Sequence, residues 1–203
     1  EIPPQLRYNM PIETLFTVVP FILVIGFFVQ TTVDMNEIEK KVDSEYRIEV
    51  IGKQWSWDFN YTNDNVYDSG LQLPENQSEA ELPVLYLPVN KTVEIDLVSR
   101  DVIHSFWVID FLYKKDVFPG FVNKMYITPQ DIGDYKGKCA ELCGEYHSAM
   151  LFNVKVVSEA DYKAHMAKLE ALGYKGQLTA DPNDPDNLNR NNNQPGDDPE
   201  IRG

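Results

Sequence analysis

The chain begins with one long apolar stretch. Residues 14–33 read TLFTVVPFILVIGFFVQTTV and contain no charged side chain. A helix needs roughly 20 apolar residues to cross the hydrocarbon core of a bilayer, so the stretch predicts a transmembrane helix over about residues 12–34. Asn9 and Pro11 suit its first turn, and membrane helices tolerate a proline such as Pro20 as a kink. The alternative is a long buried helix of a soluble protein. The absence of charged residues favours a membrane helix over this alternative.

From about residue 46 to residue 157, apolar and polar positions alternate with a period of two, which is typical of β-strands. The alternation is clearest in residues 55–61, 93–97, 103–108 and 152–156. Proline, glycine and asparagine separate these runs, and several short strands with such breaks predict an antiparallel sandwich or barrel. A polar stretch at residues 62–82 predicts an exposed loop insertion.

After residue 157 the pattern predicts a short helix and a polar tail. Ser158 and Asp161 form a capping box before apolar positions at helical spacing, and Gly173 ends the helix. His165 on this helix is expected at the surface. From residue 176 the tail contains many Asn, Pro and acidic residues and no aromatic one, so we expect it to be disordered or to lie over a partner. The predicted organisation is a membrane segment, a β domain, and a helix with a flexible tail, at residues 1–45, 46–157 and 158–203.

Composition narrows the function classes. The 203 residues include 32 acidic and 18 basic ones, a net charge of -14. A nucleic-acid binder needs a basic face, so this balance argues against one. Residues 34–203 alone hold 30 acidic and 17 basic residues, a net charge of -13. The mean hydropathy of -0.36 is therefore an average over an apolar membrane stretch and an acidic remainder.

One short stretch gathers the candidate metal ligands. The run CAELCGEYHSAM contains both cysteines of the chain, Cys139 and Cys143, followed by His147 and Met150. Thiolate, imidazole and thioether are the ligands of copper in electron-transfer sites. A second histidine, His104, lies upstream on a predicted strand.

The number of donors indicates more than one copper ion. One Cys, two His and a weak Met make a mononuclear blue-copper site, whereas this chain offers a second thiolate. Two thiolates can instead bridge two copper ions, with one histidine on each ion and weak bonds from Met and a backbone carbonyl. A plain disulfide is an alternative that leaves the histidines and Met unexplained. A zinc site is another, although zinc gains nothing from Met.

Several segments resemble cytochrome c oxidase subunit II, in that family's order over about residues 5–157. CAELCGEYHSAM closely resembles its CuA motif, and the strand DVIHSF, the turn KDVFPG, the aromatic run QWSWDFNY and the helix start PIETLFTVVP resemble other parts of it. The insert and the runs HSFWV and KKDVFPG look most like actinobacterial members. The chain departs from the family at Ser56, where a tyrosine is usual, and at Asn60, where an acid is usual. The family normally has an earlier membrane helix, and residues 1–13 before the apolar stretch contain none.

The resemblance implies a fold and a ligand set. The fold would be a cupredoxin-like β-barrel or sandwich, preceded by the transmembrane helix. Two copper ions would be bound by His104, Cys139, the backbone carbonyl of Glu141, Cys143, His147 and Met150. The side chain of Glu141 would reach a magnesium or manganese ion shared with the catalytic subunit.

Three further residues receive roles from the resemblance. Trp55 would receive the electron beside the copper, although either Trp55 or Trp57 could instead belong to the core. Asp101 would lie near the surface where the donor docks, or be an ordinary surface acid. Glu13 would lie at the mouth of a proton path, although an acid at a helix start also suits the helix dipole.

The implied function is that of the electron-accepting subunit of a haem-copper cytochrome c oxidase. Electrons from a c-type cytochrome would pass to haem in the catalytic subunit, where oxygen is reduced to water. The implied partners are subunits I and III, membrane lipid, and a c-type cytochrome that can be held in the membrane within a bc-type complex.

The implied location is the plasma membrane, with the copper domain on its extracytoplasmic face. Flanking charges counted alone favour the opposite orientation, because one basic residue precedes the helix and several follow it, namely Arg7 against Lys40, Lys41 and Arg47. Three other functions remain open: a membrane-anchored copper-binding or copper-delivery protein, a structural subunit, and a CuA domain of nitrous oxide reductase.

Overall fold

The structure is a computed structural model that describes residues 3, 7–70, 82–181 and 183–184. It divides into two compact units, Glu1–Lys41 and Val42–Gly203. Most of the predicted loop at residues 62–82, and most of the predicted tail, lie outside the described residues.

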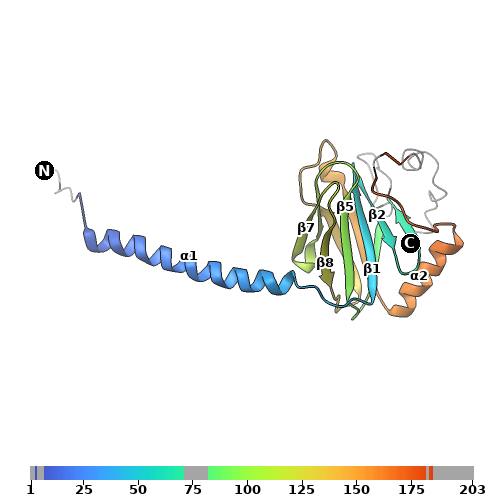
Figure 1. Cartoon of the computed structure of the whole chain (residues 1–203), viewed down its shortest axis with the longest axis horizontal. Helices are drawn as coiled ribbons and strands as arrows, with labels where there is room; N and C mark the ends of the chain where they lie inside the picture. The colour runs from blue at the N-terminus through green and yellow to red at the C-terminus, as the bar shows by residue number, and fades with distance from the viewer. Residues whose placement is uncertain (1–2, 4–6, 71–81, 182, 185–203) are drawn as a thin grey trace. The chain divides into compact units, whose positions relative to one another are not determined.

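The first unit is built around helix α1 (Met10–Ile38), which is longer at both ends than predicted (Figure 1). Asn9 and Glu13 cap it reciprocally: Asn9 Oδ1 accepts from the Ile12 N–H at 3.4 Å, and Glu13 Oε1 accepts from the Asn9 N–H at 3.0 Å. Its 29 residues extend about 43 Å at the usual rise per residue. With a mean hydropathy of 2.3 over its most apolar window, α1 is long and apolar enough to cross a membrane.

The second unit contains two five-stranded sheets. The first sheet has the order β3 (Val66–Ser69), β2 (Ser56–Tyr61), β1 (Tyr46–Lys53), β5 (Val93–Ser99) and β8 (Asn123–Ile127). The second has the order β4 (Val84–Pro88), β10 (Leu151–Val157), β9 (Gly133–Cys139), β6 (His104–Val108) and β7 (Tyr113–Val117). Within the described residues, two short 3₁₀ helices lie in the connections, η2 (Ile109–Phe111) and η3 (His147–Ala149).

The sheets differ from the prediction in two respects. Most strand pairs are antiparallel, as expected, but β1 pairs with β5 and β4 pairs with β10 in parallel. The start of the predicted exposed loop is also a strand, because β3 pairs with β2 through registers such as Tyr61 with Val66. Alternation along one strand carries no information on the direction of its neighbour, so the pattern predicts strands better than their pairing.

Aromatic side chains fill the space between the two sheets. The Trp57 ring lies 5.7 Å from that of Phe106 and 5.5 Å from that of Phe152, and the last two stack at 4.9 Å. All three are buried. Trp57 is therefore a core residue, and it supports the strand ends from which the candidate site is built.

Helix α2 (Glu159–Ala171) closes one side of the sandwich, where it contacts the edge strands β3 and β4 (Figure 1). The Ser158 hydroxyl accepts from the Asp161 N–H at 3.1 Å, as the predicted cap requires. The expectation that His165 lies at the surface is wrong, because its ring stacks on Tyr86 with centroids 3.6 Å apart. His165 belongs to the buried stripe of α2, which also contains Tyr162, Met166 and Leu169.

Residues 174–181, which we call the C-terminal segment, cover the outer face of the first sheet. Leu178 packs there against Ile51 and Val98. The side-chain amide of Asn60 donates to Leu178 O and accepts from Leu178 N–H, each at 2.8 Å. The polar side chains of β2 are consequently buried, although their alternation is typical of a solvent-facing edge.

Candidate metal centre

Strands β6 and β9 bring the candidate ligands together at one end of the second sheet. Cys139 ends β9, and the connection to β10 carries Cys143, His147 and Met150; residues 139–150 are called the ligand loop below. His104 begins β6, which pairs with β9 in antiparallel fashion. A rigid sheet thus holds two of the donors, and the loop supplies the others.

Five side chains converge within a few ångströms. The Sγ atoms of Cys139 and Cys143 lie 3.8 Å apart. His104 Nδ1 lies 3.9 Å from Cys139 Sγ, and His147 Nδ1 lies 3.4 Å from Cys143 Sγ. Met150 Sδ lies 3.8 Å from Cys143 Sγ. Each histidine therefore lies next to a different sulfur of the cysteine pair.

This arrangement fits metal binding. At the bond lengths known for zinc, about 2.3 Å to sulfur and 2.0 Å to nitrogen, two donors at tetrahedral angles lie roughly 3.5–3.8 Å apart. The separations between donors are close to these values. His104, Cys139 and Cys143 place their donor atoms within 4.8 Å of one another, and His147 extends the set on the far side of Cys143. Soft sulfur with imidazole is the donor set that copper prefers.

The backbone carbonyl of Glu141 joins the cluster, at 3.2 Å from Cys139 Sγ. The side chain of Glu141 is exposed. The Glu141 carbonyl therefore faces the sulfurs, while its carboxylate is exposed. The two roles predicted for Glu141 need this arrangement.

The two cysteines differ in acidity. Burial raises the pKa of Cys139, but hydrogen bonds from His104 and from backbone N–H groups outweigh this effect and lower it. Burial and the neighbouring Cys139 thiolate raise the pKa of Cys143 to about 12. Two negative charges 3.8 Å apart in a buried site repel each other, so the metal-free pair favours a single ionisation.

Asp101 orients His104. The His104 Nε2–H donates to Asp101 Oδ1 at 2.8 Å, which leaves Nδ1 directed at the cysteines. Burial lowers the pKa of His104, but its hydrogen bonds with Asp101 and Cys139 outweigh this and raise it. Burial raises the pKa of Asp101, yet hydrogen bonds from His104 and two backbone N–H groups lower it overall. A carboxylate behind an imidazole is the usual second layer of a metal site.

The turn between β1 and β2 contacts the ligand loop from outside. Gln54 Nε2 and Trp55 Nε1 both donate to the Cys143 carbonyl, at 2.8 and 3.1 Å. The Trp55 ring also packs edge-on against Tyr146, with centroids 5.1 Å apart. Trp55 is only partly buried. It therefore lies between solvent and Cys143, whose sulfur belongs to the candidate centre.

Two glycines leave the space that this arrangement needs. A Cβ on Gly52 would lie 2.8 Å from Cδ2 of His104, which is closer than side chains tolerate. Gly144 has φ +124, and a Cβ there would lie 2.9 Å from the Trp55 ring. A side chain at either position would displace a residue of the centre.

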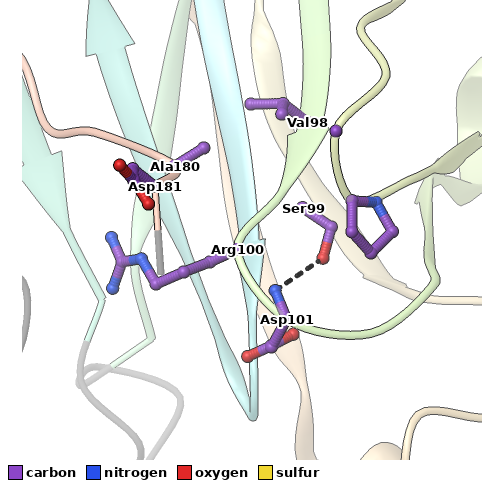
Figure 2. Close-up of a pocket in the computed structure, with 8 residues that line it drawn as sticks. Val98, Ser99, Arg100, Asp101, Ala180 and Asp181 are labelled. Atoms are coloured by element: carbon purple, nitrogen blue, oxygen red, sulfur yellow. Dashed lines mark hydrogen bonds between the residues drawn. The ribbon is translucent and has the colours of Figure 1, made fainter. Parts of the chain in front are cut away.

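An open pocket of about 530 Å³ lies beside Asp101 (Figure 2). Within it, the Asp101 N–H donates to Ser99 Oγ at 3.2 Å, the dashed line of Figure 2. Asp101 thus lines the pocket and also accepts the hydrogen bond that orients His104. The lining consists of Val98, Ser99, Arg100, Asp101, Pro119, Gly120, Ala180 and Asp181.

Comparison with protein families decides the relationship. The family described as cytochrome C oxidase subunit II, periplasmic domain, matches residues 46–157, more than half of the chain. The chain belongs to this family. The resemblance read from the CuA-like motif is thereby confirmed.

Curated members of the family are similar over most of the chain. The probable cytochrome c oxidase subunit 2 of Streptomyces avermitilis is 44% identical over 214 residues, which cover 89% of this chain and 66% of that protein. Cytochrome c oxidase subunit 2 of Mycobacterium tuberculosis is 32% identical, covering 82% of this chain and 60% of its own length. The chain thus spans just under two thirds of these relatives, and the predicted likeness to actinobacterial members is confirmed.

Solved structures support the fold. The periplasmic domain of cytochrome oxidase subunit II from Bradyrhizobium japonicum has a TM-score of 0.59 and 26% identity, covering 64% of this chain and 96% of that one. A chain of a heme-copper terminal oxidase dimer has a TM-score of 0.51 at 21% identity, covering 71% of this chain and 99% of that one. The predicted cupredoxin-like fold with an N-terminal apolar helix and a short C-terminal helix is confirmed.

The structure also locates residues that sequence reasoning missed. Gln54 begins the aromatic run, yet its contact with Cys143 is visible only in three dimensions. The sequence pattern gives no role to Gly52, in strand β1, or to Gly144, in the ligand loop; only the nearby His104 and Trp55 rings show why a side chain is excluded there. Glu13 lies on the other unit, where it caps α1, so its role in proton uptake stays a prediction.

Proposed function

We propose that this chain is the electron-accepting subunit of a haem-copper cytochrome c oxidase. The observation that carries the proposal is the convergence of His104, Cys139, Cys143, His147 and Met150 at separations of 3.4–3.9 Å. When bound there, two copper ions supply a one-electron acceptor between a c-type cytochrome and haem in the catalytic subunit, where oxygen is reduced to water.

Each group of residues has a distinct task in this proposal. The two cysteine sulfurs and the two histidines would hold the metal ions. Met150 and the Glu141 carbonyl would add weaker bonds. Because Asp101 fixes His104 and the sheet fixes Cys139, these donors need little rearrangement when the charge of the site changes.

Trp55 is the residue through which we expect the electron to arrive. Its ring is partly exposed, while its Nε1 hydrogen-bonds to the Cys143 carbonyl at 3.1 Å. Asp101, also partly exposed, would lie near the docked donor. The Glu141 carboxylate would hold a magnesium or manganese ion at the contact with subunit I.

The remaining partners follow from the family. Helix α1 would anchor the chain in the plasma membrane, in contact with lipid and with subunits I and III, and Glu13 would begin a proton path. The copper domain would face the extracytoplasmic side, where a c-type cytochrome can reach it. A membrane-held cytochrome of a bc-type complex would suit this geometry.

Metal analysis and spectroscopy test the proposal. The full chain, purified in detergent and loaded with copper, should hold two copper ions and show the hyperfine pattern of an electron shared equally by two copper nuclei. Cys143→Ser removes one bridging sulfur and should abolish that pattern. Ser148→Ala, an exposed residue of the same loop, is the control and should leave it unchanged.

The competing function is copper delivery. A delivery protein would bind one copper ion per chain and exchange it readily with a chelator. One exchangeable ion in the wild-type chain, or an unaltered two-copper spectrum in Cys143→Ser, would contradict the electron-accepting role.

A further inference from the structure

A buried ion cluster lies on the outer face of the first sheet, close to the metal centre but not part of it. The Asp58 carboxylate is fully buried. Its Oδ1 accepts from Lys53 Nζ and from Ser69 Oγ, each at 2.7 Å, and its Oδ2 accepts from an Arg100 Nη at 3.0 Å. We call these four residues the Asp58 cluster.

Such a cluster is weak evidence for stability by itself. Removing charges from water costs several kcal/mol per ion, and their attraction often only offsets that cost. The Lys53 and Arg100 side chains are just 9% and 13% exposed, so both have lost most of their hydration. The arrangement therefore calls for a role beyond net stability.

The positions of the two cations along the chain indicate that role. Lys53 ends β1 and directly precedes Gln54, which hydrogen-bonds to the Cys143 carbonyl. Arg100 follows β5 and directly precedes Asp101, which orients His104. The Asp58 carboxylate thus binds a cation on each of the two backbone segments that contact Cys143 and His104.

Hydrogen bonds donated by backbone N–H groups join these segments to each other. The Arg100 N–H donates to Gly52 O at 2.9 Å, and the Gln54 N–H donates to Asp101 Oδ2 at 2.7 Å. Figure 2 shows the Arg100 and Asp101 side chains leaving the end of β5 in different directions. Arg100 can therefore be held by Asp58 while Asp101 stays directed at the metal centre.

We propose that Asp58 is a positioning residue of the metal centre: by binding Lys53 and Arg100, it fixes Gln54 and Asp101 and thereby the placement of Cys143 and His104. The inference rests on the proposed copper function for its biological meaning. The cluster itself belongs to the chain with or without metal.

The same sheet supplies a matched control. Asp96 on β5 is also a buried carboxylate with two cationic partners, Arg47 and Lys124. It is paired with Glu49, farther along the sheet from the β1–β2 turn. Among the described residues, none of the hydrogen bonds of Arg47 and Lys124 reaches a candidate ligand. Asp96→Asn therefore removes a buried carboxylate and its ion pairs without disturbing the turn, although Arg47 and Lys124 are more exposed than Lys53 and Arg100.

The test compares Asp58→Asn with Asp96→Asn in the copper-loaded full chain. We expect Asp58→Asn to release copper to a Cu(I) chelator up to about tenfold faster than wild type, because loss of a direct partner of a metal ligand costs roughly 10–100-fold in affinity and Asp58 acts one layer farther out. Its copper hyperfine splitting should also change. Asp96→Asn should keep the wild-type release rate and spectrum. Equal release rates and equal spectra for the two variants would overturn the proposal.

Variants that remove only one of the two cations keep the test decisive if Asp58→Asn does not fold. Arg100→Gln and Lys53→Gln each leave one cation to neutralise Asp58. Arg100→Gln should accelerate copper release and change the His104 ring resonances, while Lys53→Gln should alter the fluorescence of Trp55. If both single variants match Asp96→Asn in these signals, the cluster has a structural role only.

Hydrogen exchange separates this inference from the copper proposal. In the copper-free full chain, the Gln54 amide is protected by its bond to Asp101. Asp58→Asn or, if needed, Arg100→Gln should speed its exchange relative to the Val50 amide of the preceding strand β1, and Asp96→Asn should not. A wild-type chain without a two-copper centre would refute the copper function alone, whereas unchanged Gln54 exchange would refute the positioning role.

Discussion

His165 shows how one buried side chain makes folding depend on pH. Its ring stacks on Tyr86, and its Nε2 has no hydrogen-bond partner in the part of the chain that the structure describes. Burial, together with the nearby Lys168 and Lys155 charges, lowers the pKa of His165 to about 4. The folded chain therefore holds this histidine neutral over a range in which the unfolded chain protonates it.

Stability should accordingly fall as the pH falls from about 6.5, the ordinary pKa of histidine, toward 4. Over this window the unfolded state binds more protons, so the free energy of unfolding loses up to about 3 kcal/mol from this residue. His165→Phe keeps a ring on Tyr86 and removes the titration. Denaturant unfolding at several pH values should give a shallower loss for the variant; parallel curves would contradict this account.

The C-terminal segment contributes to the fold at the scale of whole elements. Its backbone joins the edge of the first sheet, with the Gly176 N–H donating to Asn65 O at 2.8 Å and the Tyr67 N–H donating to Tyr174 O at 3.1 Å. It then covers Asn60 and the Asp58 cluster, with the Thr179 carbonyl accepting from Arg100 at 3.3 Å. A segment beyond the last helix thus keeps water from the buried ions behind the metal centre.

Asn60→Ala tests this attachment. The substitution leaves the N–H and C=O of Leu178 without their partner, which costs about 1–3 kcal/mol for each buried group left unpaired. We expect faster hydrogen exchange at the Leu178 amide and earlier proteolytic cleavage within residues 174–181. Asn63→Ala, at an exposed turn, is the control, and equal exchange at Leu178 in both variants would show that packing alone holds the segment.

The sequence predicts some of these elements well and others poorly, for physical reasons. The apolar run and the ligand loop are local, because the donors after Cys139 lie within a few residues of one another. The buried polar face of β2 is not local, since Asp58 and Asn60 are covered by a segment more than a hundred residues away. The hydrogen bonds of Gln54 with Asp101 and of Arg100 with Gly52 depend on the parallel pairing of β1 with β5, which alternation does not encode.

Charge acts at the scale of the whole molecule. Acidic residues outnumber basic ones by 32 to 18, and residues 34–203 carry 13 of the 14 excess negative charges. On the ligand loop, the side chains of Glu141 and Glu145 are exposed. A field of this sign attracts a protein with a basic face, and attraction before contact raises association rates by roughly 10- to 1,000-fold at low salt.

We therefore expect a basic, soluble c-type cytochrome to reduce the copper-loaded chain more slowly as salt increases. Raising the ionic strength from 0.01 to 0.1 M shortens the screening length from about 30 to 10 Å, which should lower the second-order rate constant roughly tenfold. Stopped-flow absorbance measures this rate, with a small uncharged reductant as the salt-independent control. A rate that does not respond to salt would mean that the acidity does not steer the donor, as expected if the donor is instead held beside the chain in the membrane.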